Sequence, residues 1–216
     1  MNIANNLSHI KKSIPNHVQI IAVSKTKTKD QILKIYNAGH RDFGENKIQE
    51  MRIKYDELPK DIKWHMIGHV QTNKVKYIAR FISLIHAVDS IKLLKEINKQ
   101  AIKNNINIRC LIQIKIAKEE SKNGISKDKL NDLMCFSNNL KNINIVGLMG
   151  MATYTSNKDI INSEFKELSI LFNNLKTSYP KLSVLSIGMS DDYLIAIKNG
   201  SNMIRVGSKI FGERKS

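Results

Sequence analysis

Short apolar runs rich in Val and Ile alternate along the chain with longer segments in which apolar residues recur every three or four positions. The short runs are typical of buried β-strands, and the longer segments are typical of helices that pack one face against a core. The pattern predicts strands at residues 18–24, 41–44, 64–68, 82–88, 109–116, 143–149, 183–188 and 202–207. A polar helix over about residues 2–13 is expected before the first strand.

Residues that cap helix N-termini mark where the helices begin. Thr28, with Gln31 three residues later, forms a capping box, and Gly39 is expected to end that helix. The other helices are predicted to begin near Asn46, Thr72, Ser90, Ser126, Asn157 and Ser190, with a short segment after the last strand.

Strands that are buried on both faces and alternate with helices form a parallel sheet. Eight such repeats favour an α/β fold of the TIM type, a closed (β/α)8 barrel, over an open doubly wound sheet. We expect a single domain over residues 1–216, because a chain of 216 residues is near the lower length limit of this barrel.

The net charge of +16 raises the question of nucleic-acid binding. Only six of the 35 Lys and Arg residues are Arg, and Lys, Ile and Asn share A/T-rich codons, so base composition accounts for much of the charge. No run of Lys and Arg exceeds two residues, and 6% aromatic residues leave few side chains for base stacking. A basic nucleic-acid-binding protein is therefore an alternative that the sequence disfavours.

The chain has no apolar run near the roughly 18 residues that a membrane span requires. Its first twenty residues also lack the apolar stretch of a secretory signal. The two cysteines, Cys110 and Cys135, stand far apart, which argues against a disulfide framework and a cysteine metal site. These features predict a cytoplasmic protein that does not associate with membranes.

In (β/α)8 barrels the binding residues come from the carboxyl ends of the strands. Lys25 directly follows the first predicted strand, so its amine is expected at the barrel mouth, where partial desolvation favours imine chemistry. Because the chain holds 35 Lys and Arg residues, a merely solvated lysine is the alternative for this residue taken alone. Lys27 in the following loop is the competing candidate.

Two glycine-containing turns follow the seventh and eighth predicted strands, at residues 188–190 and 206–208. Barrels commonly bind a phosphate there through backbone amides, and Ser190 is expected at the N-cap of the next helix. Glycines of purely structural importance are equally consistent with these turns. Asp191 and Asp192 are expected to cap the helix, since inward-pointing carboxylates would repel a phosphate.

Arg205 interrupts an apolar strand, where a guanidinium is costly unless it is paired or faces the barrel mouth. We expect it to contact a ligand there. His65 and His69 fall on a strand and the turn after it, too far apart to share a metal, so no metal site is predicted. The absence of Walker, GxGxxG and GxSxG motifs disfavours an NTPase, a nicotinamide-dependent enzyme and a serine hydrolase.

Several motifs follow one another in order: AVSKTKT at 22–28, FGENKIQE at 43–50, WHMIGHVQTNK at 64–74, VDS at 88–90, SKNGIS at 121–126, GLMGMA at 147–152, GMSDDYLIAI at 188–197 and RVGSKIFG at 205–212. Together they resemble the signature of the pyridoxal phosphate homeostasis protein family, from about residue 20 to the C-terminus. The resemblance implies a fold-type III barrel like the N-terminal domain of alanine racemase. It also implies pyridoxal 5′-phosphate (PLP) held as an imine on Lys25.

The same resemblance implies that the phosphate is held by the last two strand–helix turns and that Arg205 faces the pyridine nitrogen. The implied cofactor-binding residues are Lys25, Asn46, His69, Met189, Ser190, Arg205, Gly207 and Ser208. Three positions depart from the family pattern. Thr28 replaces a frequent proline, which should be harmless because Thr caps the helix, whereas Gly150 and Tyr154 leave the shape of the sixth loop open.

The resemblance implies a cofactor carrier that takes part in vitamin B6 and amino-acid homeostasis, without an assigned reaction. A monomer that delivers the cofactor to PLP-requiring apo-enzymes is consistent with this implied role. The alternative is a fold-type III amino-acid racemase or decarboxylase. Such enzymes borrow a second acid/base from a further domain and a partner subunit, and 216 residues leave no sequence for that domain.

Overall fold

The computed structural model describes residues 2–119 and 122–213 and shows a closed barrel of eight parallel strands. The strands are β1 (Gln19–Val23), β2 (Asp42–Glu45), β3 (Lys63–Met66), β4 (Ile82–Val88), β5 (Ile108–Gln113), β6 (Ile143–Met149), β7 (Val184–Ser186) and β8 (Met203–Val206). They pair in chain order, and β8 pairs with β1 to close the ring. The (β/α)8 fold predicted from the hydrophobic pattern is confirmed.

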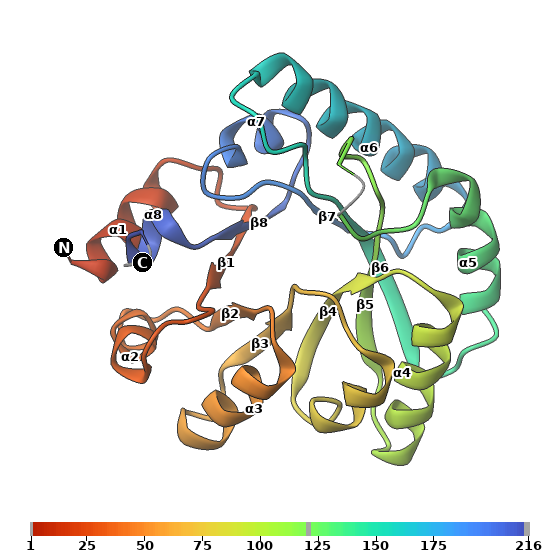
Figure 1. Ribbon diagram of the computed structural model, residues 1–216, viewed down its shortest axis with the longest axis horizontal. Helices are drawn as coiled ribbons and strands as arrows, with labels where there is room; N and C mark the ends of the chain where they lie inside the picture. Colours follow the sequence, from red (N-terminus) through yellow and green to blue (C-terminus); the bar gives the residue numbers. More distant parts are fainter. Residues whose placement is uncertain (1, 120–121, 214–216) are drawn as a thin grey trace.

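Helices surround the barrel on its outside (Figure 1). The α-helices are α1 (Ile3–Lys12), α2 (Lys29–Asn37), α3 (Ile48–Glu57), α4 (Ile91–Lys103), α5 (Leu130–Ser137), α6 (Lys158–Ser178), α7 (Tyr193–Lys198) and α8 (Ser208–Phe211). Two 3₁₀-helices, η1 (Thr72–Tyr77) and η2 (Lys127–Lys129), complete the connections.

Three predicted helix starts carry the expected side-chain caps. Thr28 and Gln31 form both hydrogen bonds of the capping box before α2. The Ser90 side chain accepts from Leu93 N before α4, and the Asn157 side chain accepts from two amides at the start of α6. Local sequence therefore decided where these helices begin, because each cap satisfies backbone donors that a helix leaves unpaired.

Other helix starts differ from the prediction. The helix expected near Thr72 is the 3₁₀-helix η1, whose buried Val75 lies three residues before the buried Ile78 at its C-cap, the repeat of that helix type. The helix expected at Asn46 begins at Ile48, because the Asn46 backbone is packed so closely against Gly68 that a Cβ on Gly68 would lie 2.4 Å from Asn46 O.

The prediction that Ser190 is an N-cap is wrong. Helix α7 begins at Tyr193, and Asp192 occupies the N-cap position. A turn precedes the helix, in which the Met189 amide donates to Asp192 Oδ1 at 2.5 Å and the Asp192 amide donates to Met189 O at 3.2 Å. Gly188 enters this turn with a φ of 96°, a left-handed conformation that glycine adopts without strain. Because of this turn, the helix begins three residues after Ser190, and Ser190 Oγ accepts a hydrogen bond from the Gly207 amide instead.

The core has two layers. The larger layer lies between the outer face of the strands and the helices, and includes Trp64, Phe43 and Phe165. The smaller layer fills the barrel interior with Ile21, Leu84, Ala87, Leu111, Met149, Val184 and Met203. This interior layer is small because polar side chains from several strands share the space. These side chains are hydrogen-bonded to one another and to Arg205.

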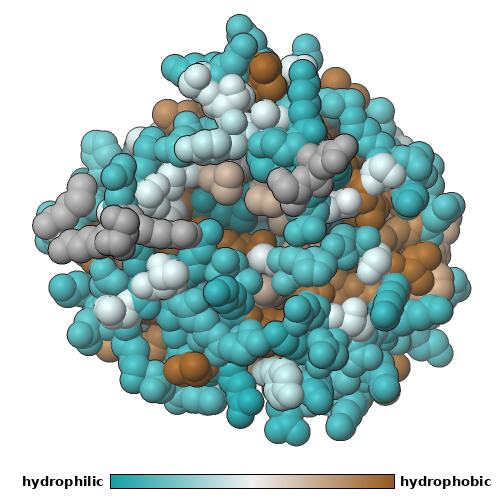
Figure 2. Space-filling model, viewed as in Figure 1, coloured by the Kyte–Doolittle hydropathy of each residue, from teal (hydrophilic) through white to brown (hydrophobic). Residues whose placement is uncertain are grey.

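The two ends of the described chain lie side by side, where α1 packs against α8 (Figure 1). The Asn6 side chain donates to Ile210 O at 3.0 Å across this contact. Hydrophilic residues dominate the face of the molecule seen in Figure 2. Within the described parts of the chain, no helix has the length and apolar character needed to cross a bilayer. Ser121, the first residue of the SKNGIS motif, lies outside the described residues.

Candidate functional site

The carboxyl ends of the strands surround a cavity of about 770 Å³. All eight residues predicted for the site line this cavity: Lys25, Asn46, His69, Met189, Ser190, Arg205, Gly207 and Ser208. The fold therefore brings together residues from the loops after β1, β2, β3, β7 and β8. Its lining also includes Lys27, Gln113, Asn123, Met151, Tyr154 and Asp191. The expectation that Asp191 caps the helix is wrong, because Asp192 takes the N-cap position and Asp191 lines the cavity.

Lys25 is presented by a tight turn directly after β1. It is partly buried between the fully buried Ser24 and the exposed Thr26. Thr26 has a φ of 65°, which is unfavourable for a β-branched residue. The Lys27 amide donates to Ser24 O at 3.0 Å and closes the turn. A strained turn persists only where its surroundings hold it in place.

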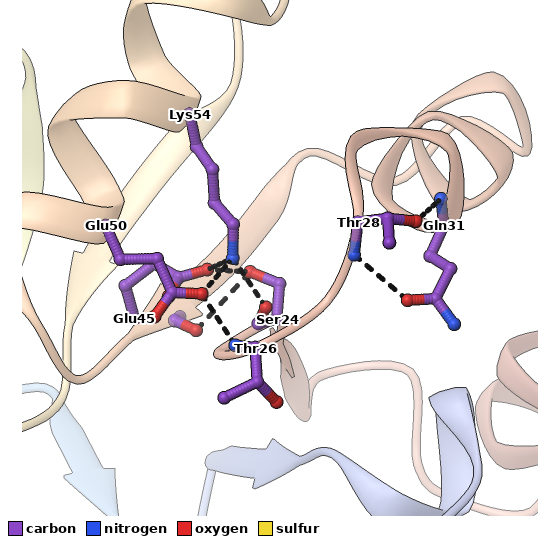
Figure 3. A network of polar contacts seen from close by, with 8 residues as sticks. Ser24, Thr26, Thr28, Gln31, Glu45, Glu50 and Lys54 are labelled. Atoms are coloured by element: carbon purple, nitrogen blue, oxygen red, sulfur yellow. Dashed lines mark hydrogen bonds and ion pairs between the residues drawn. The ribbon is translucent and has the colours of Figure 1, made fainter. Parts of the chain in front are cut away.

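Four side chains beside the turn hold it: Ser24, Glu45, Glu50 and Lys54, which we call the Lys25 network (Figure 3). Ser24 Oγ donates to Glu45 Oε1 at 2.6 Å. Lys54 Nζ, reaching down from α3, lies 2.8 Å from the same Glu45 oxygen and 2.7 Å from Glu50 Oε1. A cation is thus bound between two carboxylates at the end of β2.

The Lys25 network also forms hydrogen bonds with the backbone on both sides of Lys25. Lys54 Nζ donates to Ser24 O at 2.7 Å, and the Thr26 amide donates to Glu50 Oε1 at 2.6 Å (Figure 3). Both bonds end on residues that flank Lys25. The network therefore determines the conformation of the turn that carries the lysine.

Glu45 is the most deeply buried member of this network, with 0% exposure. Burial raises the pKa of its carboxyl above the ordinary value of 4.5, and the nearby Lys54 charge opposes that shift. Among the described residues, Glu45 Oε2 is buried without a hydrogen-bond partner. Lys54 is thus shared by two carboxylates, and of these two it is Glu45 that has a buried oxygen without a hydrogen bond among the described residues.

Ser190 and Gly207 meet at the ends of β7 and β8, where Gly207 packs against Val23 of β1. The Gly207 amide donates to Ser190 Oγ at 3.1 Å, so the two last strand–helix turns are joined. The hydroxyl hydrogen of Ser190 is not used in that bond and can donate to an anion. The Asp192 carboxylate accepts from the Met189 amide, which precedes the helix, so Asp192 occupies the N-cap position without the predicted side-chain cap.

Arg205 is 3% exposed at the base of the cavity. Its Nη1 donates to Ser186 O at 2.7 Å and to Ser186 Oγ at 2.8 Å, and its Nη2 donates to Gly150 O at 2.9 Å. Burial lowers the pKa of Arg205 to about 10, and the nearby Asp192 charge opposes that shift. The guanidinium is therefore charged at neutral pH and is oriented by β7 and the loop after β6.

Sequence reasoning missed several polar residues of the barrel interior. Ser186 contacts His86, His86 contacts His65, and His65 contacts Asp42. His65, His86 and Ser186 are strand residues that each lie between two apolar neighbours, and that isolation is the signal that could have found them. Asp42 follows His40 and Arg41 and carries no such signal. Their partners could not be read from the sequence, because the contacts join strands that are far apart along the chain.

His65 and His69 have separate partners, as the strand assignment predicted. His65 faces the barrel interior, whereas His69 is half exposed and its Nδ1 lies 3.2 Å from Asp89 Oδ2 at the mouth. In the described part of the chain, no group of three or more His, Cys, Asp or Glu side chains is arranged to hold a metal.

Comparison with known proteins identifies relatives of the whole chain. The family model described as "Alanine racemase, N-terminal domain" matches residues 1–215. The protein named "Pyridoxal phosphate homeostasis protein" from Aquifex aeolicus is 39% identical over 202 residues, covering 93% of this chain and 89% of that protein. The Haemophilus influenzae protein of the same name is 37% identical and covers 99% and 97% of the two chains. These matches confirm the resemblance inferred from the motifs.

Solved structures show the same fold. PipY of Synechococcus elongatus PCC7942, described as having PLP bound, has a TM-score of 0.90 and 31% identity, covering 97% of this chain and 100% of that chain. Alanine racemase of Clostridium difficile 630 has a TM-score of 0.81 at 14% identity, and the match covers 57% of that longer chain. At this lower identity the likeness concerns the barrel fold alone.

Proposed function

Because the chain belongs to the alanine racemase N-terminal domain family and groups there with the pyridoxal phosphate homeostasis proteins, we propose that it binds PLP as a cofactor carrier. On this proposal it takes part in vitamin B6 and amino-acid homeostasis. The observation that carries the proposal is the gathering of all eight predicted residues around one cavity at the barrel mouth.

The chemistry of the cavity fits this cofactor. PLP supplies an aldehyde carbon that combines reversibly with amines and a pyridine ring that withdraws electrons. Lys25 brings a primary amine into the cavity, and the three cations Lys25, Lys27 and Arg205 outnumber the one carboxylate of the described lining, Asp191, so the lining suits a phosphate ester. Where the turns at Ser190 and Gly207 are joined, the Ser190 hydroxyl adds a hydrogen-bond donor.

We assign the residues as follows. Lys25 is the covalent attachment point, presented by its turn and held by the Lys25 network. Ser190 Oγ and the backbone amide of Ser208 bind the phosphate, since the first amides of α8 have no partner within the helix. Gly207 lines the same side of the cavity and its amide holds Ser190 Oγ in place. Arg205 contacts the pyridine nitrogen.

Three further residues complete the assignment. Asn46, His69 and Met189 line the remaining walls of the cavity.

We infer that the chain carries the cofactor and does not catalyse a reaction at ordinary enzyme rates. Arg205 retains its charge, and a guanidinium beside the pyridine nitrogen disfavours protonation of that nitrogen. This weakens the electron-withdrawing ring on which carbanion chemistry depends. The proteins that receive the cofactor are then apo-enzymes that require it, and the carrier acts as a cytoplasmic monomer.

The attachment is tested by loading the protein with PLP, reducing it with borohydride and locating the label by peptide mass spectrometry. We expect a visible absorption band before reduction and label on Lys25. Lys25→Ala should abolish that label, whereas Lys27→Ala should retain it, and pyridoxal without its phosphate should bind more weakly. Full labelling of the Lys25→Ala protein, or equal binding of pyridoxal and PLP, would contradict the assignment.

The carrier role is tested with an assay of racemisation, transamination and decarboxylation across the proteinogenic amino acids. We expect exchange of the bound cofactor with free amino acids but no turnover in the range of about 1 to 1000 per second that enzymes show. Lys25→Ala serves as the blank. A Lys25-dependent turnover in that range for any one amino acid would identify the protein as an enzyme.

A further inference from the structure

A continuous series of hydrogen bonds crosses the interior of the barrel. It joins five side chains from β2, β3, β4, β7 and β8, namely Asp42, His65, His86, Ser186 and Arg205, which we call the Arg205 chain. The successive contacts are His65 Nε2 to Asp42 Oδ1 at 3.1 Å, His65 Nδ1 to His86 Nε2 at 3.0 Å, and His86 Nδ1 to Ser186 Oγ at 3.3 Å. Arg205 Nη1 to Ser186 Oγ, at 2.8 Å, completes the series.

The position of every proton follows from the two ends. A guanidinium has only donors, so Ser186 Oγ accepts from Arg205, and its hydroxyl hydrogen, which has no other acceptor among the described residues, is donated to His86 Nδ1. His86 Nδ1 is therefore the acceptor, and the ring, being neutral, carries its proton on Nε2. That proton is donated to His65 Nδ1.

The opposite end leads to the same arrangement. A carboxylate has only acceptors, so His65 Nε2 must carry a proton and donate it to Asp42 Oδ1. His65 Nδ1, in a neutral ring, must then accept from His86 Nε2. Every bond thus points from the guanidinium toward the carboxylate, and reversing one bond would set two donors or two acceptors against each other.

Burial agrees with two neutral rings between two charges. His86 is 0% exposed and His65 is 3% exposed, and burial lowers the pKa of both imidazoles. The charged or titratable groups near these rings are His40, Asp42, Lys63, Arg109 and Arg205. The chain reaches solvent at Asp42, whose side chain is 17% exposed at the start of β2, on the far side of the barrel from the cavity.

We propose that Asp42, His65, His86 and Ser186 are positioning residues that act as one directed hydrogen-bond chain to orient Arg205 for the cofactor. The inference rests on the proposed function only where it concerns PLP. Ser186 contacts the guanidinium directly, and the other three determine the orientation of the Ser186 hydroxyl. The far end of the barrel is thereby connected to the base of the cavity.

The proton arrangement is tested first, by NMR on the full chain with ¹⁵N-labelled histidine and without cofactor. We expect His65 and His86 each to be fully in the Nε2–H form, with a nitrogen–nitrogen coupling across the hydrogen bond between them. Both should stay neutral at pH 6.5, the ordinary pKa of an imidazole, because burial lowers the pKa of both rings. An Nδ1–H form of either ring, or the absence of that coupling, would overturn the chain whether or not PLP binds.

The positioning role is tested with two matched pairs of variants. Ser186→Ala removes a contact to Arg205, whereas Ser201→Ala removes a buried hydroxyl that bonds only to backbone carbonyls. Asp42→Asn and Asp61→Asn each remove one carboxylate charge, but the Asp61 carboxylate pairs with Arg41 and has no contact to the chain. The readouts are the dissociation constant for PLP and the absorption spectrum of the bound cofactor.

We expect Ser186→Ala to weaken PLP binding about tenfold, as for loss of a hydrogen bond to a charged group. Asp42→Asn should weaken it about twofold and mix the histidine tautomers, since polarisation along such chains fades with each bond. Both should shift the spectrum, and both controls should leave it unchanged. Equal effects of Asp42→Asn and Asp61→Asn, or of Ser186→Ala and Ser201→Ala, would overturn the positioning role. Failure of the wild-type protein to bind PLP would instead refute the proposed function.

Discussion

The Lys25 network and the Arg205 chain are both buried and polar, but they are built from opposite chemistry. The Lys25 network pairs one lysine with two carboxylates outside the barrel wall, between β2 and α3. The Arg205 chain separates its two charged ends by two histidines and a serine inside the barrel. Strand β2 contributes to both, because alternate residues point to opposite faces: Asp42 lies inward and Glu45 outward.

The difference matches what each network must hold. The Lys25 network restrains a backbone turn that contains the strained Thr26, and short ionic hydrogen bonds provide that restraint. The Arg205 chain holds a side chain, and neutral imidazoles avoid most of the desolvation cost of buried ions. A network of ions is therefore sensitive to loss of one charge, whereas a chain of neutral groups is sensitive to proton uptake.

The largest expected effect follows from removing the single cation of the Lys25 network. Lys54→Met keeps a similar length but leaves Glu45 and Glu50 without their shared partner. Breaking a buried ion pair in this way costs about 3 to 5 kcal/mol of unfolding free energy. Urea denaturation at neutral pH measures the loss.

Lys29→Met is the matched control for that prediction. Lys29 pairs with Glu57, but the two side chains are 52% and 39% exposed, so the expected cost is about 1 kcal/mol or less. Similar losses in the two variants would show that the Lys25 network has no special importance for stability.

A smaller effect is expected from the Arg205 chain, where the gain of a charge on a histidine, and not the loss of a charge, destabilises the fold. Burial lowers the pKa of His65 and His86 below the ordinary value of 6.5, so below that pH only the unfolded chain takes up these protons. Stability should therefore fall as the pH decreases from 6.5, by at most about 1.4 kcal/mol per pH unit for each group. His86→Gln should reduce this slope. An unaltered slope in His86→Gln would contradict the prediction.

The smallest effect concerns Glu45, whose pKa shift has the opposite sign. Its pKa is raised above 4.5 in the folded protein, so the folded state keeps this proton longer, and stability is lost as the pH rises through that range. Glu45→Gln removes the loss, so its stability relative to wild type should increase from pH 4.5 toward neutral. We expect a difference within about 1 kcal/mol at neutral pH.

Glu57→Gln, which changes a partly exposed carboxylate, is the control for Glu45→Gln. An equal rise in Glu57→Gln would mean that burial of Glu45 is not the cause of the effect. A constant difference for Glu45→Gln would mean that Glu45 ionises normally in the folded protein. Thermal or urea unfolding at several pH values measures both variants.

The sequence was sufficient for features that depend on neighbouring residues or on repetition. The eight strands follow from short apolar runs, and the caps at Thr28, Ser90 and Asn157 follow from residues within one helical turn. Parallel strands place their carboxyl ends at one rim, so the gathering of Lys25 and Arg205 around one cavity followed from the barrel itself.

Only the tertiary structure decided which polar residues are partners. Glu45 and Lys54 are nine residues apart, and His86 and Ser186 are one hundred residues apart, yet each pair is in contact. The start of α7 was also mispredicted, because the Gly188 turn and the carboxylate of Asp192 outweigh the capping tendency of Ser190. Local patterns determine which helix or strand a residue belongs to and on which face of that element it lies. Barrel closure sets the distances between elements, and hydrogen bonds depend on those distances to within tenths of an ångström.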